Sequence, residues 1–337
     1  MALCAVAMLS MVACKKDTNE NQNNPGGGTE QVPQGEGIFS PSQKIETITI
    51  DGQLSEEWTW TNDKLVSIAK AEGGAMLDNT TFEYNGWRVS SMSTIMESMP
   101  VDVDYTYNND KLSTVAAYSS YLQVVGILFD HNAEGKINHL SLNINSMLLD
   151  ALVQMLGNGI PIFGMKGPAS SKMSIDSTNF NAYLTWQGDN VSQMVLSGTV
   201  MAQLTLDEIS QYMNIDSLIG GNSWMLAMLT DSTLSVTINL ADTNRYTYDS
   251  QHNPFCGYLG ALDITTMSAN NVATMHASGV VNISVTAQTL MGPVTLPLPS
   301  YPIEERNDTY TYTYNSAGYP LTSTNSEGSV TQYTYKQ

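Results

Sequence analysis

Residues that could carry out acid–base or metal chemistry are scarce and scattered along this sequence. Its 337 residues include 4 histidines, and segment 130–135 (DHNAEG) has the oxygen-bearing side chains of a calcium-binding loop. Ser141 stands where such a loop needs a glutamate to close the coordination shell, so a tight turn explains these residues better than a metal does. Nucleophile elbows, zinc-binding helices, phosphate loops and dinucleotide fingerprints do not occur in the sequence.

Paired acids are the remaining candidates for catalysis. Glu56 and Glu57 are adjacent, and Asp207 and Glu208 fit the first turn of a helix. A glycosidase needs two acids that face each other across a cleft, and that arrangement depends on the fold. We therefore expect no catalytic residues, no metal site and no cofactor, and we expect the chain not to be an enzyme.

The charge balance narrows the choice of partners. The sequence has 13 basic and 32 acidic residues, which give a net charge of -19 and a pI of about 4.3. Such an acidic chain repels the phosphates of nucleic acids and the head groups of anionic lipids. We therefore expect no nucleic-acid partner.

Residues 1–14 have the features of a bacterial lipoprotein signal peptide. Residues 2–13 (ALCAVAMLSMVA) are apolar but too short to cross a membrane as a helix, and the letters MVAC at 11–14 resemble a lipobox. We expect acylation of Cys14 and a lipid-anchored location at the bacterial outer membrane, on either its periplasmic or its cell-surface side. Residues 15–41, rich in Asn, Gly and Pro, are expected to form a disordered tether.

A hairpin-like unit recurs through the rest of the chain. Each copy has alternating aromatic and Thr residues, an Asn/Asp/Gly turn, and a strand that opens with Leu, Val or Ile. One hairpin of two strands and two turns needs roughly 22 residues, which is the usual interval between copies. The Tyr/Thr alternation at 309–314 puts every Tyr on one face of a strand. The aromatic residues taken as equivalent are Trp60, Tyr84, Tyr107, Phe129, Trp186, Tyr248, Tyr314 and Tyr335.

One spacing does not fit a regular strand. Leu65 and Ile68 follow the first turn three residues apart, as Leu112 and Val115 follow the third, so each pair would face opposite sides of the sheet. A β-bulge would bring both residues to one face, and burial of both faces would also explain the spacing.

The repeated unit resembles the YD-type repeats of Rhs-like proteins, on residues 184–191 (LTWQGDNV) and above all on 246–255 (YTYDSQHNPF). Residues 45–337 together resemble a Bacteroides-type family of lipoproteins of unknown function with a porin-like β fold. The resemblance implies an antiparallel β fold and a bacterial envelope location, and it implies no particular activity. A membrane-spanning barrel is not expected, because the strands lack apolar outer bands and the sequence does not end in an aromatic residue.

Two longer intervals between repeats carry Met-rich apolar residues. Short helical insertions are expected near 144–160 and 205–229, since 146–156 (SMLLDALVQML) has helical spacing and 205–208 (TLDE) fits a capping box. These insertions could cap the sheet and fill its core, line a cavity for an apolar or lipid-like ligand, or bind another protein. The candidate ligand-binding residues are Met147, Leu148, Leu152, Met155, Trp224, Met225 and Met228.

The aromatic strand faces allow another interpretation. They would stack on sugars if they were exposed to solvent, and they would stabilise the sheet as cross-strand pairs if they were buried. The residues concerned are Trp58, Trp60, Tyr84, Tyr107 and Trp186.

The sequence predicts a mainly β domain over 42–337. Its antiparallel hairpin repeats are expected to form a strongly curved sheet or barrel with short helical insertions. We expect a non-catalytic bacterial envelope lipoprotein that binds an apolar or lipid-like ligand. A surface module that binds glycans or proteins, and a purely structural repeat scaffold, are the alternatives.

Overall fold

The computed structural model describes residues 35–72, 75–96, 99–145, 174–205, 233–260, 266–289, 292–297 and 300–336. Within these residues the chain consists of β-strands joined by turns, with no α-helix, which confirms the predicted mainly β fold of antiparallel hairpins. The helical insertions predicted at 144–160 and 205–229 are not seen, because these ranges lie almost wholly outside the described residues. Their described edges, Ile144 and Thr205, are the last residues of two strands.

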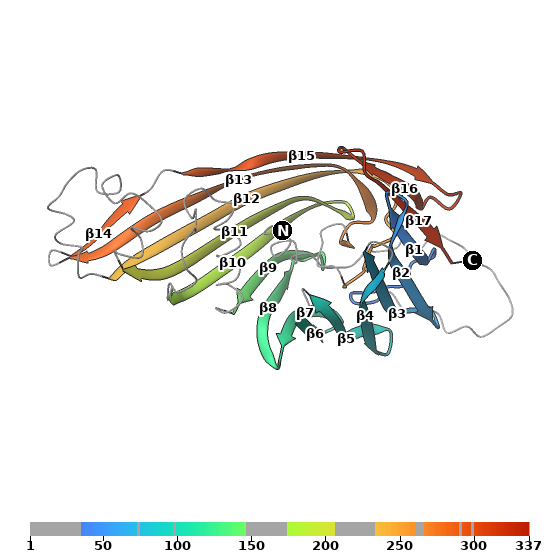
Figure 1. The fold of residues 1–337 in the computed structure, drawn as a ribbon, viewed down its shortest axis with the longest axis horizontal. Coiled ribbons are helices and arrows are strands. Elements are labelled where there is room, and N and C mark those ends of the chain that lie inside the picture. Colours follow the sequence, from blue (N-terminus) through green and yellow to red (C-terminus); the bar gives the residue numbers. More distant parts are fainter. Residues whose placement is uncertain are drawn as a thin grey trace.

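In the part of the chain that the structure describes, seventeen strands form one antiparallel sheet. Strand β14 pairs with the outer part of β13, while β15 pairs with the inner part. Pairing of β1 with β17 closes the other sixteen strands into a barrel (Figure 1). The strands are β1 (Ile45–Ile50), β2 (Gln53–Thr61), β3 (Lys64–Glu72), β4 (Ala75–Asn85), β5 (Arg88–Met96), β6 (Met99–Asn108), β7 (Lys111–Ser119), β8 (Leu122–His131), β9 (Ile137–Ile144), β10 (Ser174–Gln187), β11 (Asn190–Thr205), β12 (Thr233–His252), β13 (Asn270–Thr289), β14 (Gly292–Pro297), β15 (Tyr301–Tyr314), β16 (Pro320–Asn325) and β17 (Val330–Tyr335).

The strands differ in length, and this difference divides the molecule into two parts. Strands β1–β9 have 6 to 11 residues, whereas β10–β13 have 14 to 20. The register between β9 and β10 covers residues 180–183 of β10, so the outer parts of the long strands run on past the closed barrel (Figure 1). We call this curved sheet the extension. It comprises 174–179 of β10, 199–205 of β11, 233–239 of β12, 282–289 of β13, and β14.

A β-bulge lies beside the turn of each repeated hairpin. The register shifts at Trp60, which then pairs with Leu65, and the bulge brings Leu65 and Ile68 to the same inner face, where both are 1% exposed. The bulge therefore explains the three-residue spacing. The turn residues Asn62 and Asp63 have positive φ angles of 48° and 63°, which tight hairpins require. The pairs beside the bulges are Trp60–Leu65, Tyr84–Val89, Tyr107–Leu112, His131–Ile137, Trp186–Val191, Tyr248–Val272 and Tyr314–Pro320.

The equivalence of Phe129 with Tyr107, taken from the spacing, is wrong. His131 pairs with Ile137 across its bulge, and Phe129 lies two residues earlier on the same face of β8. The turn at 132–136 is longer than the turn before it, so counting residues displaced the alignment. A histidine therefore occupies the position that Trp or Tyr occupies in the other units.

The aromatic residue beside the bulge is tied to the main chain of the preceding unit. The Tyr84 hydroxyl donates a hydrogen bond to the Leu65 carbonyl at 2.7 Å, and burial raises the pKa of Tyr84, which keeps the donor protonated. We call this contact the aromatic–carbonyl joint. It recurs at 2.6–2.9 Å from Trp60 to Ile45, Tyr107 to Val89, Trp186 to Ile137, Tyr248 to Val191, Tyr312 to Val272 and Tyr335 to Pro320. In the β15–β16 hairpin the donor, Tyr312, lies two residues before Tyr314, which is beside the bulge and donates to Asp249.

The first and last strands form an eighth unit without a turn. Tyr335 pairs with Ile45 beside a register shift, and the Lys336 N–H donates to the Lys44 carbonyl at 2.8 Å. Joints from Trp60 and Tyr335 attach this unit to its two neighbours. Eight units of two strands thus close the ring, and closure removes the exposed strand edges that an open sheet would have.

Replacement of Tyr84 by Phe tests the stabilising effect of one joint. We expect Tyr84→Phe to lower the free energy of unfolding by about 1 kcal/mol, because a partly buried hydrogen bond is lost. Tyr121→Phe is the control, since Tyr121 is fully exposed at a turn. Unfolding of both variants in urea measures the difference. Equal stability of the two variants would show that the joint contributes nothing.

Candidate functional site

The residues predicted from the sequence to bind a ligand lie outside the described residues, as does Cys14. Their roles therefore stay predictions, and a site within the described part of the chain must be built from other residues. The residues concerned are Met147, Leu148, Leu152, Met155, Trp224, Met225 and Met228.

The aromatic residues considered for sugar stacking lie inside the barrel. Trp58 and Trp60 are 4% and 8% exposed. Trp60, Tyr84 and Tyr107 use their N–H or O–H groups in joints, and the Trp186 indole does the same. These rings stabilise the sheet, and they are not available as a platform for a glycan.

A cluster of aromatic rings fills the closed part of the barrel. The Phe39 ring centroid lies 6.2 Å from that of Trp58, 5.5 Å from that of Trp60 and 5.4 Å from that of Tyr258. Tyr258 belongs to the loop 253–260 that follows β12, and burial raises its pKa well above the usual value. The loop and the segment around Phe39 thus supply part of the core from outside the strands.

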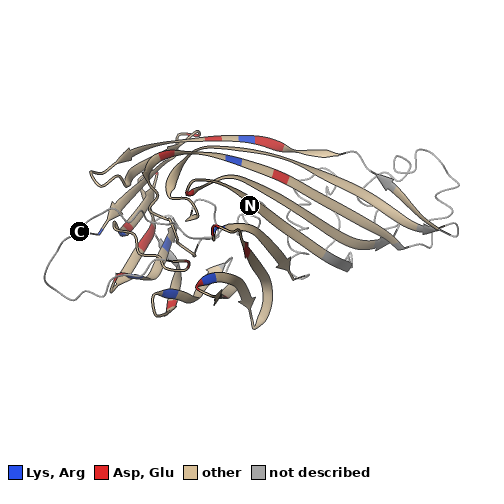
Figure 2. Ribbon diagram, turned by 180° about the vertical axis from the view of Figure 1, so that it is seen from behind, with Lys and Arg blue, Asp and Glu red and all other residues tan. Residues whose placement is uncertain are grey.

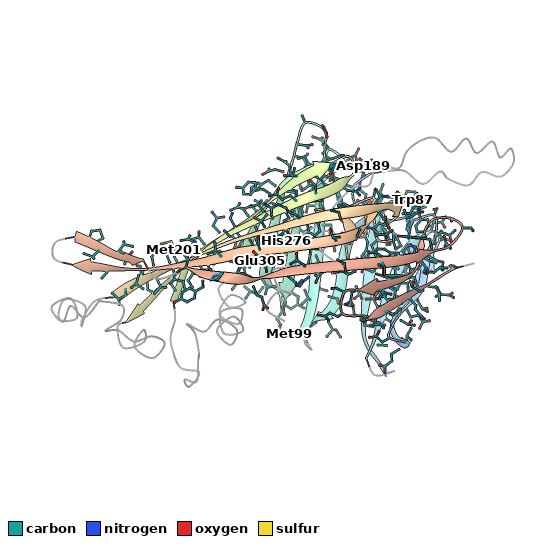
Figure 3. The ribbon with its side chains drawn as sticks, turned by 90° about the horizontal axis from the view of Figure 1, so that it is seen from above. Trp87, Met99, Asp189, Met201, His276 and Glu305 are labelled. Atoms are coloured by element: carbon teal, nitrogen blue, oxygen red, sulfur yellow. The ribbon has the colours of Figure 1, made fainter. Side chains whose placement is uncertain are left out.

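The repeat turns surround one end of the barrel, which we call the mouth. Trp87 and Asp189, in two of these turns, lie at the mouth, while Met201 lies on the extension at the other end of β11 (Figure 3). Segment 35–39 enters the mouth, where Glu36 and Phe39 are 5% and 4% exposed. The prediction that the tether reaches residue 41 is therefore wrong. Its Gly-rich composition is typical of disorder, but strands distant in the sequence bury it.

Glu36 lies in the mouth beside His131, the histidine that stands where other units have Trp or Tyr beside the bulge. Its Oε2 accepts a hydrogen bond from the Leu112 N–H at 2.6 Å, and its two carboxylate oxygens lie 2.9 Å and 3.0 Å from His131 Nε2. Where the other units have an aromatic–carbonyl joint, Glu36 bridges the His131 side chain to the main chain of the preceding unit. Sequence reasoning missed Glu36, since nothing local in a Gly-rich stretch indicates burial.

A carboxylate beside an imidazole can activate a nucleophile, which requires a hydroxyl or thiol at the other ring nitrogen. The Glu36 carboxylate joins the His131 imidazole to a main-chain N–H, that of Leu112. Among the described residues, no group of three or more His, Cys, Asp or Glu side chains is placed to hold a metal ion. The pair therefore has the geometry of a structural joint.

The inner face of the extension is apolar. Leu234 and Ile283 are 0% and 3% exposed there, whereas Thr199 and Asn239 are hydrogen-bonded to each other on the outer face at 2.9 Å. The outer parts of β11, β12 and β13 carry no Lys, Arg, Asp or Glu (Figure 2). The inner-face residues are Val200, Ala202, Leu234, Val236, Ile238, Ile283, Val285 and Ala287.

The alternation of side chains along β12 is a sequence signal for this face. Residues 233–240 (TLSVTINL) alternate strictly between polar and aliphatic side chains, which is typical of a strand with one buried face. The prediction of a binding surface relied on the Met-rich residues near 144–160 and 205–229, and it did not use the strands themselves.

A polar pair borders the apolar face where the extension joins the closed barrel. Asn244 is 8% exposed, and its Nδ2 donates to Asp242 at 2.9 Å. Asp242 follows Leu234 and Ile238 at even positions of β12, so it lies on the same face. The inner surface therefore changes from aliphatic to acidic along one strand.

Comparison with protein-family models finds no family that matches the chain, and comparison with curated proteins finds no match. In the described residues, no helix is long and apolar enough to cross a membrane. Function must therefore be inferred from the geometry of the barrel.

Replacement of Glu36 by Gln tests the bridge at the mouth. We expect Glu36→Gln to lower the free energy of unfolding by about 2 kcal/mol, because the half-buried His131 loses its carboxylate partner. Glu134→Gln, at an exposed turn residue, is the matched control. Thermal and urea unfolding compare the two. A stability of Glu36→Gln equal to that of the control would contradict a structural role for the bridge.

Proposed function

We propose that the chain is a non-catalytic lipoprotein of the bacterial outer membrane that holds an apolar or lipid-like ligand against the inner face of the extension. The observation that carries this proposal is the aliphatic surface that runs across β11–β13, where Ala202, Val236 and Val285 are cross-strand neighbours. These side chains are buried, so a ligand must displace the part of the chain that covers them. An acyl chain on such a surface gains about 0.8 kcal/mol for each methylene that it buries. The lipobox-like segment that ends at Cys14 supports membrane attachment.

The chemistry at the inner end of the face indicates the polar group of the ligand. Asp242 and Asn244 border the aliphatic surface, and no Lys or Arg lies on the outer parts of β11–β13. A carboxylate-bearing ligand such as a fatty acid would be repelled by Asp242. We therefore expect a ligand whose polar group is neutral or positively charged and donates hydrogen bonds.

Native mass spectrometry of the whole chain, followed by lipid extraction, tests this function. The protein is purified in mild detergent from its own outer membrane. We expect an apolar molecule to copurify with it, and an acyl mass on Cys14 in the same spectra. A folded protein that carries no such molecule and binds no apolar probe would contradict the proposed function and favour a structural scaffold.

The double variant Val236→Thr/Val285→Thr tests the location of the site with little change in volume. These cross-strand partners both face inward, so the variant adds two hydroxyl groups to the apolar surface. Each buried hydroxyl costs about 1 kcal/mol or more, so we expect binding of a fluorescent apolar probe to weaken about tenfold or more.

Thr237→Val is the matched control, because it makes the reverse exchange on the outer face of β12. We expect it to bind the probe as the unchanged chain does. Equal binding by the double variant and this control would exclude the inner face of the extension as the site.

A further inference from the structure

Segment 35–39 lies in the mouth without forming a strand of the barrel. Strand β1 begins at Ile45, and the ring closes through pairing of β1 with β17 and β2. Departure of the segment would therefore break no strand pairing. The segment is also continuous with the predicted tether, so it is attached to the barrel through residues 40–44 alone on its other side.

The mouth binds the segment at two subsites, which we call seats. In the first, the His131 imidazole and the Leu112 N–H are hydrogen-bonded to the Glu36 carboxylate. In the second, the rings of Trp58, Trp60 and Tyr258 surround the ring of Phe39, three residues further along.

The main chain between the two seats is also recognised. The Val89 N–H donates to the Gly37 carbonyl at 3.0 Å, and the Arg88 Nε donates to the Glu36 carbonyl at 3.2 Å. Gly37 has a φ of 75°, and a Cβ added there would overlap the Tyr107 hydroxyl. The position after the acidic residue must therefore be glycine.

Arg88 is held in place by groups of the barrel itself. Its guanidinium forms an ion pair with Asp110 at 2.9 Å and lies over the Tyr107 ring, 5.8 Å from the centroid. His131 and Leu112 belong to β8 and β7. The first seat is thus built from residues of the barrel strands, and the second combines strand residues with Tyr258 of the loop 253–260.

We propose that the mouth is a peptide-binding site that residues 35–39 fill in cis. Its ligand in trans is a segment of a partner protein that turns at a glycine, as residues 35–38 do, with an acidic residue directly before that glycine and an aromatic residue three positions after the acid. Binding exchanges one such segment for another, as when a peptide displaces an intramolecular mimic of itself. This site is separate from the extension, and it does not rest on the function proposed above.

A fluorescent peptide with the sequence of residues 33–41 (PQGEGIFSP) tests the proposal against the full-length chain. In the double variant Glu36→Ala/Phe39→Ala, the segment no longer offers the two side chains that occupy the seats. We expect fluorescence polarisation to report binding to this variant, and binding about tenfold or more weaker to the unchanged chain, whose site is filled. The same peptide with alanine in place of its central glycine is the control, and we expect it not to bind.

Gly37→Ala in the full-length chain is the second variant. It keeps every side chain of the segment and expels the segment by overlap with Tyr107, so it too should bind the unmodified peptide. Near-ultraviolet circular dichroism establishes whether each variant is folded. Failure of the folded variants to bind the peptide, or equal binding of the control peptide, would overturn the proposal. Unfolding of both variants would also overturn it, because the segment would then be an inseparable part of the core.

Discussion

The hydrogen bond from an aromatic side chain to a main-chain carbonyl of the preceding unit is the interaction on which the barrel depends. Strand pairing alone leaves successive hairpins able to slip against one another in register. The bulge turns the aromatic residue inward beside the turn, and its donor then fixes one hairpin against the previous one, as Tyr84 does at Leu65. Repetition of this contact around the ring brings Tyr335 opposite Ile45, where the barrel closes.

The departure from this pattern at β8 coincides with the entry of the amino-terminal segment. His131 has no main-chain carbonyl of the preceding unit as its described partner, and Glu36 makes the connection for it. The extension, at the other end of the long strands, has an aliphatic inner face, and the residues that the structure describes there include no aromatic filling like that of the closed part. The repeat therefore builds the framework, and the two proposed binding regions lie where the repeat is modified or runs past the ring.

Sequence periodicity was sufficient to predict the hairpins, because an aromatic residue, a turn and an aliphatic residue recur at nearly constant intervals. It was not sufficient to align Phe129 and His131, since a longer turn changes the count while the register depends on the bulge. Burial of Glu36 and Phe39 could not be predicted either, because their neighbours lie on strands far away in the sequence. The alternation at 233–240 carries a signal for the apolar face, but the predicted binding residues were placed elsewhere, and they lie outside the described part of the chain.

Closure of the barrel by its first and last strands is the central claim, and amide hydrogen exchange of the full chain tests it most directly. We predict that the amides of β1 and β17 are protected as strongly as those of β6 and β7, because all four strands are paired on both sides. Mass spectrometry of peptic fragments resolves these segments. Rapid exchange along the facing edges of β1 and β17, with β6 and β7 still protected, would show an open sheet and contradict the closed ring.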